Sequence, residues 1–167
     1  MNILEQFKDI KTFVFDMDGV LTDGTLLIYS GTEWLRKMHI RDGHALKEAS
    51  EKGYRIIIIS GSSSVPVKKR LHLLGVKDVY MSEPDKKERL EKYIKKHSLN
   101  PQEILYMGDD VPDVTCMQMV GLPCMPNDGA HELKGISKYI SPYKGGEGCV
   151  RDVIEKVMKL NNKWSAE

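Results

Sequence analysis

Two aspartates, Asp16 and Asp18, stand directly after a short apolar run, where their side chains are well placed to do chemistry. The run at 13–15 predicts a buried strand, so both carboxylates emerge at its carboxyl end. Two acids at such a point are costly unless a cation or a reaction at an anionic site needs them. One carboxylate can attack phosphorus as a nucleophile while its neighbour handles the proton.

Further polar groups follow the other predicted strands. Ser60 and Gly61 come after a run of four isoleucines, and an acidic segment with Asp109, Asp110 and Asp113 follows a later apolar run. In open parallel sheets, ligands bind at the carboxyl ends of the strands. We therefore expect these groups to share one edge of the sheet with the first aspartate pair.

The crowding of carboxylates at this edge predicts a bound cation. Two carboxylates about 4 Å apart repel by roughly 4 kcal/mol at an effective dielectric of about 20, so three such pairs cost on the order of 12 kcal/mol. That cost is comparable to the stability of a whole domain. Oxygen ligands without imidazole or thiolate select a hard ion, and Mg²⁺ fits because it keeps waters and accepts phosphate. Lys86 adds a charge that can hold a phosphoryl group, and Ser60 offers a hydroxyl.

Each motif taken singly also has a structural explanation. Asp-x-Asp-Gly occurs in Asx turns and calcium loops, Ser60 precedes an ordinary loop glycine, and a lone lysine such as Lys86 is usually solvated. Asp110 fits either a helix-capping acid or a group that supports the metal ligands, and Asp113 fits either a metal ligand or a group that orients Lys86. Their order at successive strand ends favours one shared site. A signalling receiver domain is disfavoured, because the isoleucine strand ends in Ser60 and not in a phosphoacceptor aspartate.

The composition bounds the class of protein. The chain has 167 residues, 41% of them hydrophobic and 29% charged, as in one soluble globular domain spanning 1–167. A net charge of +1 gives no case for binding nucleic acid or a membrane. The N-terminal residues show no export signal. Three widely spaced cysteines fit reduced thiols, so we expect a cytoplasmic location.

Short apolar runs alternate with helical patterns, which predicts a Rossmann-like α/β fold with a parallel sheet and helices on both faces. The predicted strands lie at 12–15, 55–59, 78–81, 104–107, 122–125 and 139–140. The predicted helices lie at 42–52, 65–74, 84–97, 112–120 and 150–160, with a short capped turn at 100–103. Residues 161–167 are expected to form a loose tail.

The segment 24–40 breaks this alternation and predicts a β-hairpin inserted after the first strand, with Ser30 in its turn. Its two strand-like stretches, 24–29 and 32–40, place apolar side chains at alternating positions, namely Leu26, Ile28, Trp34 and Met38. A lone hairpin is marginal in water. Its apolar side must therefore pack either on its own domain or on another subunit.

These motifs, in this order, resemble those of the haloacid dehalogenase superfamily of phosphohydrolases. The matching residues are Asp16-Met17-Asp18-Gly19-Val20-Leu21-Thr22, Ser60, Lys86, and Gly108-Asp109-Asp110 with Asp113. The resemblance implies that Asp16 forms an aspartyl-phosphate and that Asp18 is the general acid and base. It also implies Mg²⁺ on Asp16, the backbone carbonyl of Asp18, and Asp109. Ser60 and Lys86 would bind phosphate.

A closer resemblance, over roughly 10–158, is to the capless subgroup of this superfamily. Too few residues separate Thr22 from the 42–52 helix for a cap domain, and the segments 41–43 and 145–148 match this subgroup. The resemblance implies hydrolysis of a 2-keto-3-deoxy sugar acid phosphate, namely 3-deoxy-D-manno-octulosonate 8-phosphate, in lipopolysaccharide biosynthesis. It also implies a homotetramer in which a neighbouring subunit covers the active site.

The same resemblance implies a set of substrate-binding residues. They are Asp18, His39, Ile40, Arg41, Asp42, Gly43, Lys47, Gly61, Arg70 and Lys86. Ser62 and Glu147 stand where this family usually has arginine, which leaves the substrate's carbon number open. A nine-carbon nononate or acylneuraminate 9-phosphate is the alternative substrate. A catalytically silent oligomerisation module of a sugar nucleotide synthetase is the alternative function.

Overall fold

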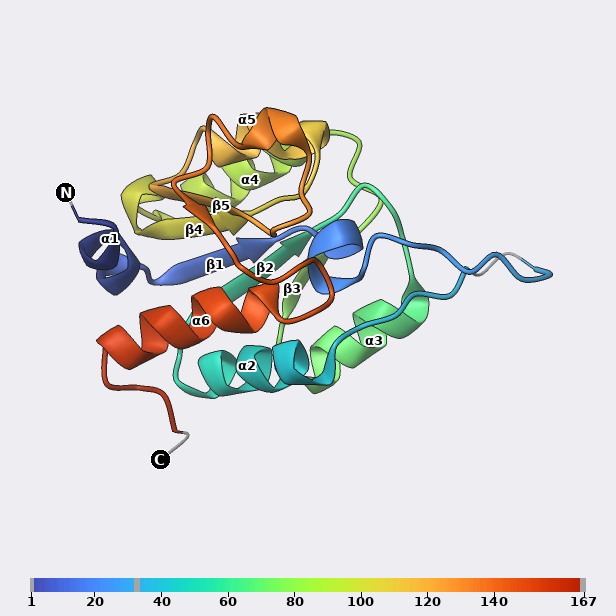
Figure 1. Ribbon diagram of the computed structural model, residues 1–167, viewed down its shortest axis with the longest axis horizontal. Helices are drawn as coiled ribbons and strands as arrows, with labels where there is room; N and C mark the ends of the chain where they lie inside the picture. Colours follow the sequence, from blue (N-terminus) through green and yellow to red (C-terminus); the bar gives the residue numbers. More distant parts are fainter. Residues whose placement is uncertain (1, 32–33, 166–167) are drawn as a thin grey trace.

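The computed structural model describes residues 2–31 and 34–165, and it has a parallel sheet between two layers of helices (Figure 1). The sheet has the strand order β3-β2-β1-β4-β5-β6, with every pair parallel. The strands are β1 (Thr12–Phe15), β2 (Arg55–Ile59), β3 (Asp78–Tyr80), β4 (Ile104–Met107), β5 (Leu122–Met125) and β6 (Tyr139–Ile140). This confirms the predicted α/β architecture, with β3 ending one residue before its predicted limit.

Most of the predicted helices form close to their expected bounds. The helices are α1 (Ile3–Asp9), α2 (Ile40–Glu51), α3 (Val65–Leu73), α4 (Lys86–His97), α5 (Val114–Met117) and α6 (Cys149–Leu160). Helix α1 was not expected, and a capping box between Asn2 and Glu5 begins it. The predicted helix at 112–120 is wrong in length. A 3₁₀ turn, Val111–Asp113, precedes α5, which ends at Met117.

The two faces of the sheet carry separate apolar clusters. Phe13 and Phe15 of β1 pack with residues of α1, α2, α3 and α6, whereas Val14 packs on the opposite face with residues of α4 and α5. This division follows from the alternation of side chains along a strand. Since β1 is covered on both faces, all four of its residues are buried. The predicted continuous apolar run therefore corresponds to a central strand.

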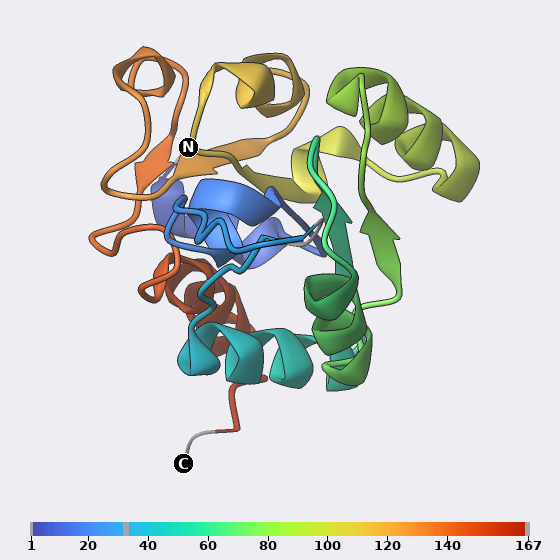
Figure 2. The same cartoon turned by 90° about the vertical axis from the view of Figure 1, so that its right-hand side faces the viewer.

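The central position of β1 decides where the functional groups meet. Phe15 is in register with Ile58 of β2 and Met107 of β4, so the three strands end at the same level. Figure 2 views the molecule from this end, with the loops that follow the strands in front. The polar residues after β1, β2 and β4 therefore reach one edge, as the sequence predicts.

The inserted hairpin is present, but its ladder is shorter than expected. Two antiparallel bridges hold it, Thr22 with Met38 and Leu27 with Leu35, and it projects from the carboxyl edge of the sheet (Figure 1). The predicted second strand at 32–40 is wrong at its end, because Ile40 already begins α2. Residues 32–33 of that prediction lie outside the described residues.

The body of the chain covers Met38 of the hairpin but leaves the apolar side chains near its tip exposed. Leu27, Ile28 and Tyr29 are 65%, 68% and 73% exposed, respectively. The sequence left open whether the hairpin packs on its own domain or on another subunit. These three side chains do not pack on their own domain. An exposed apolar patch of this kind is typical of an interaction surface.

The prediction of a loose tail is wrong for residues 161–164. Trp164 packs against the core, with its ring edge-on to His44 and the Arg151 guanidinium 5.2 Å from its centroid. Lys163 lies over Tyr54, with Nζ 4.9 Å from the ring centroid. These contacts fasten the segment after α6 to α2 and to the start of β2. Residues 166–167 of the predicted tail lie outside the described residues.

All three cysteines are free and buried. Burial raises the pKa of Cys116 to about 11 and raises the pKa of Cys124 and Cys149 well above the ordinary thiol value. They are inert apolar side chains, as reduced structural thiols are expected to be. In the part of the chain that the structure describes, no helix is long and apolar enough to cross a membrane.

Candidate active site

The chain turns sharply after β1, and this turn presents both aspartates. The Asp16 carboxylate accepts a hydrogen bond of 2.7 Å from the Met17 amide, which fixes it at the end of the strand. Gly19 has φ +83°, a conformation that side chains with a Cβ rarely adopt. A Cβ at Gly19 would also lie 1.9 Å from Oδ2 of Asp109. The turn therefore needs glycine to bring the carboxylate that follows β4 against the β1 loop.

Lys86 joins the first and last acidic segments. It is the first residue of α4, which Asp85 caps by accepting a 2.9 Å hydrogen bond from the Glu88 amide. The Nζ atom of Lys86 lies 2.9 Å from Oδ2 of Asp16 and 2.9 Å from Oδ1 of Asp113. Only 10% of the lysine side chain is exposed, so this is a desolvated charge with two partners. The structure thus brings together residues from three strand ends, as predicted.

Asp113 is surrounded by donors. In addition to Lys86, its Oδ1 accepts a 2.7 Å hydrogen bond from the Tyr106 hydroxyl, and its Oδ2 accepts a 3.1 Å bond from the Asp109 amide. Burial raises the pKa of Tyr106 well above its usual value, so the phenol remains a donor. Of the two roles left open for Asp113, orienting Lys86 is the one that these contacts favour. Asp110 caps the 3₁₀ turn, accepting a 2.7 Å bond from the Val111 amide.

A metal ion fits among the acidic groups. Carboxylate oxygens of Asp16, Asp109 and Asp113 lie within 4.8 Å of one another, on the wall of a cavity of about 210 Å³. Burial, reinforced by the Asp113 charge and opposed by Lys86, raises the pKa of Asp16 to about 8 and that of Asp109 to about 7. One lysine thus leaves these acids incompletely neutralised, and an all-oxygen donor set suits a hard divalent cation.

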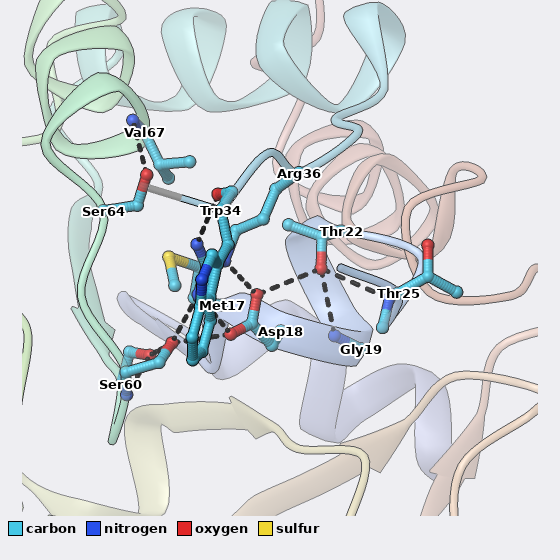
Figure 3. Close-up of polar contacts among 12 residues, drawn as sticks. Met17, Asp18, Gly19, Thr22, Thr25, Trp34, Arg36, Ser60, Ser64 and Val67 are labelled. Carbon is cyan, nitrogen blue, oxygen red and sulfur yellow. Dashed lines mark hydrogen bonds and ion pairs between the residues drawn. The ribbon is translucent and has the colours of Figure 1, made fainter. Parts of the chain in front are cut away.

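The side chain of Asp18 points to a different set of partners (Figure 3). Its Oδ1 accepts a 2.8 Å hydrogen bond from Nε of Arg36, and its Oδ2 accepts a 2.6 Å bond from the Ser62 hydroxyl. The Asp18 carboxylate is absent from the three-aspartate cluster, so its predicted contribution to a metal through the backbone carbonyl stays a prediction. Arg36 was not predicted as a site residue. In the sequence it stands between Trp34 and Met38, at an alternating position of the face predicted to be apolar.

Ser60 reaches the site only indirectly. It is buried, and its Oγ lies 3.2 Å from Oγ of Ser62, which in turn donates to Asp18. Neither Ser60 nor Gly61 lines the cavity around Asp16. Their predicted roles in binding phosphate and substrate remain predictions.

Most of the predicted substrate-binding residues lie away from the Asp16 cavity. His39 and Arg41 line a separate cavity of about 630 Å³ beside α6, and Ile40 is exposed at the start of α2. Lys47 is exposed, and its Nζ lies 3.8 Å from Oε1 of Glu51. Within one chain, the structure does not bring these residues to the Asp16 carboxylate.

The remaining members of that set have structural contacts. The buried Asp42 carboxylate accepts a 2.8 Å hydrogen bond from the Arg151 amide, at the first turn of α6. A Cβ at Gly43 would lie 2.8 Å from Nη2 of Arg70, so glycine lets this arginine pack against α2. Both contacts join helices on one face of the sheet. For Asp42, Gly43 and Arg70, substrate binding in a neighbouring subunit remains a prediction.

The C-terminal glycine segment 145–148 packs against the β1 loop. A Cβ at Gly145 would lie 1.9 Å from the Gly19 carbonyl oxygen, and the Gly146 amide donates a 2.9 Å hydrogen bond to the Val20 carbonyl. The segment thus supports the turn that carries Asp18. Glu147 lines the cavity beside α6 and does not line the one around Asp16.

The chain is similar to known phosphatases in sequence. A model of the haloacid dehalogenase-like hydrolase family matches residues 37–121. The chain is 27% identical over 162 residues to 3-deoxy-D-manno-octulosonate 8-phosphate phosphatase KdsC of Escherichia coli K12, covering 97% of this chain and 86% of that protein.

Solved structures agree closely with this one. The same phosphatase from Moraxella catarrhalis, in complex with a magnesium ion, a phosphate ion and a KDO molecule, has a TM-score of 0.93 and 31% identity, covering 98% of this chain and 94% of that one. A cobalt-bound form from Haemophilus influenzae has a TM-score of 0.89 and 25% identity, covering 95% and 92%. No cap domain stands between β1 and α2 among the described residues. The chain belongs to the haloacid dehalogenase-like hydrolase family, in its capless subgroup.

Proposed function

We propose that this protein hydrolyses 3-deoxy-D-manno-octulosonate 8-phosphate, with Mg²⁺ as cofactor and an aspartyl-phosphate on Asp16 as intermediate. Its membership of the family and its phosphatase relatives make it a phosphoric monoester hydrolase. The main support for the proposed cofactor and intermediate is that Asp16, Lys86 and the loop of Asp109 meet at the carboxyl edge of the sheet. The sugar acid is proposed as the substrate because these relatives are 3-deoxy-D-manno-octulosonate 8-phosphate phosphatases.

The residues of this chain support a two-step displacement. An Asp16 oxygen attacks phosphorus and the bond to the sugar oxygen breaks, while Asp18 gives its proton to that oxygen. Water then attacks the aspartyl-phosphate, Asp18 takes a proton from it, and inorganic phosphate leaves with Asp16 restored. The Lys86 ammonium, 2.9 Å from Asp16, offsets the charge that gathers on the phosphoryl oxygens.

Asp16 and Asp109 would hold the magnesium ion, with the Asp18 carbonyl as the third protein ligand. When bound, the ion neutralises phosphoryl charge and so lets the carboxylate approach an anionic substrate. Asp113 would keep Lys86 aimed at the same point, because both of its oxygens already accept hydrogen bonds.

We also propose that the protein is a cytoplasmic homotetramer in which the neighbouring subunit covers the site. The exposed Leu27, Ile28 and Tyr29 of the hairpin support this, since a neighbour would remove them from water. In such an assembly Arg41, Lys47 and Arg70, which are remote from Asp16 in their own chain, could reach the substrate of another subunit.

The test measures phosphate release from eight- and nine-carbon keto-acid phosphates, with Mg²⁺ and with a chelator. We expect the highest kcat/KM for the eight-carbon ester and none with the chelator. A preference for a nine-carbon ester would replace the substrate assignment and leave the chemistry intact.

The Asp16→Asn variant tests the nucleophile. It should keep the fold but lose turnover by at least about 10⁴-fold, because the amide is not a nucleophile. The circular dichroism spectrum and thermal midpoint serve as folding controls. Turnover by pure Asp16→Asn protein at a tenth of the wild-type rate would refute the assigned role.

A further inference from the structure

Arg36 of the hairpin is an unusually buried charge. Only 3% of its side chain is exposed, although residues of the same hairpin such as Lys37 are mostly exposed. A buried guanidinium needs acceptors, because an unpaired charge away from water is costly. Its only carboxylate partner within ion-pair distance, among the described residues, is Asp18.

The hydrogen bonds of Arg36 leave little capacity for a ligand. Its Nε and Nη2 donate to the two oxygens of Asp18 at 2.8 and 3.3 Å, Nη2 also donates to the Ser62 hydroxyl at 3.3 Å, and Nη1 donates to the Trp34 carbonyl at 3.1 Å. These bonds engage four of the five N–H groups that an arginine carries. The side chain is therefore built to hold a neighbour and not to receive a substrate anion.

Asp18 is held by three segments at once. Arg36 comes from the hairpin, Ser62 from the loop after β2, and Thr22, whose Oγ1 lies 3.4 Å from Asp18 Oδ1, from the end of the β1 loop. At the same time, Asp18 lines the cavity that contains Asp16. The orientation of its carboxylate thus depends on where the hairpin places Arg36, and Figure 3 shows this contact.

We propose that Arg36 is a positioning residue, which orients the Asp18 carboxylate for proton transfer and makes that orientation depend on the docked hairpin. The inference rests on the proposed function, since it assumes that Asp18 transfers the proton. The two bridges of the hairpin, Thr22 with Met38 and Leu27 with Leu35, lie on either side of Arg36. The ion pair is therefore the polar link between the hairpin and the catalytic edge.

The test compares Arg36→Met, Arg36→Lys and the control Lys37→Met, with p-nitrophenyl phosphate and Mg²⁺ as the probe. Arg36→Met should lower kcat by about 10²-fold, because well-placed acid–base groups contribute factors of this size. KM should change less than about threefold. Arg36→Lys keeps a donor near Asp18, so its kcat should be at least about tenfold higher than that of Arg36→Met. Lys37→Met should match the wild type, because Lys37 is exposed on the same hairpin.

A double variant shows whether Arg36 acts through Asp18. In an Asp18→Asn background, adding Arg36→Met should cause no further loss of kcat, because the carboxylate it orients is gone. If Arg36→Met fails to fold, Ser62→Ala gives the same information. It removes the other strong donor to Asp18 and should lower kcat severalfold with KM unchanged.

The outcomes separate the two proposals. A wild-type protein without phosphatase activity refutes the proposed function. An active wild type with an equally active, folded Arg36→Met refutes the positioning role alone. A raised KM with kcat unchanged would instead make Arg36 a substrate-binding residue, and a multiplicative loss in the Asp18→Asn background would also overturn the inference.

Discussion

A single ammonium group lies between two buried carboxylates of the candidate site. Lys86 contacts Asp16 and Asp113 at equal distances of 2.9 Å while almost buried, so each group depends on the other two for a favourable environment. Removing one member of such a set leaves uncompensated charge, which costs more than the net gain from forming it. If Lys86 acts in catalysis as proposed, activity and stability both depend on this lysine.

Replacing Lys86 with methionine should lower both activity and stability. We expect kcat/KM to fall by at least about 10²-fold and the free energy of unfolding to fall by roughly 3 kcal/mol without metal. Urea unfolding with and without MgCl₂ measures the second effect. The matched control is Lys87→Met, because Lys87 is half exposed and its Nζ lies 3.6 Å from Oε1 of Glu91 on the helix surface. Equal behaviour of the two variants would contradict the assigned role.

The raised pKa values of Asp16 and Asp109 predict how stability depends on pH. In the unfolded chain both acids titrate near about pH 4, whereas in the fold their pKa values are about 8 and about 7. The folded state thus binds more protons between these limits, so these groups contribute stability at low pH that is lost as pH rises toward 8.

Thermal midpoints from pH 5 to 8.5, with EDTA or with MgCl₂, would check this dependence. The increase in midpoint caused by MgCl₂ should be larger at pH 8 than at pH 5, because the metal competes with protons for the same oxygens. Asp109→Asn should reduce both the pH slope and the metal effect. An equal metal effect at both pH values would rule out these carboxylates as its ligands.

The ends of strands and helices position the residues of the site, and most of these ends can be predicted from the sequence. Gly19 and Asp109 come together because β1 and β4 are neighbours in register. The alternation of apolar runs and helices predicts that much. It could not show that Asp18 turns toward Arg36. That contact depends on how the hairpin folds back over its own loop, which no periodic pattern encodes.

Helix caps offer a test at this scale. Asp85→Ala removes the side-chain cap of α4 and should cost about 1 kcal/mol of stability. It should also lower kcat/KM severalfold, because Lys86 is the first residue of that helix. Asn100→Ala removes a comparable cap from the turn Pro101–Glu103, far from the cavity, and should lower stability without changing kinetics. A similar kinetic effect in both variants would argue against a positioning role for α4.

The whole molecule presents one apolar projection that its own body leaves uncovered. The sequence predicts this hairpin and leaves its partner open, because amphipathic alternation shows that a face must be buried but not against what. Arg41 and Arg70, which the family resemblance predicts to bind substrate, likewise lie outside the Asp16 cavity of their own chain. The proposed assembly, with a site shared between subunits, would account for both observations.

Charging the hairpin tests the assembly. Leu27→Glu combined with Ile28→Glu should shift the protein to smaller species in light scattering, because burying two carboxylates in an interface is costly. Activity on the sugar acid phosphate should fall more than activity on p-nitrophenyl phosphate. Leu4→Glu on α1 is the control, since Leu4 is half exposed at the other end of the sheet. An unchanged molecular mass would refute the hairpin interface.

The deep burial of Cys116, Cys124 and Cys149 has a practical consequence. Maleimide dyes and spin labels should leave the native protein almost unmodified, so a cysteine introduced at the exposed Tyr29 would be its one fast-reacting thiol. A fluorophore there could report in real time whether the surroundings of the hairpin change during turnover, and no native cysteine would have to be removed first.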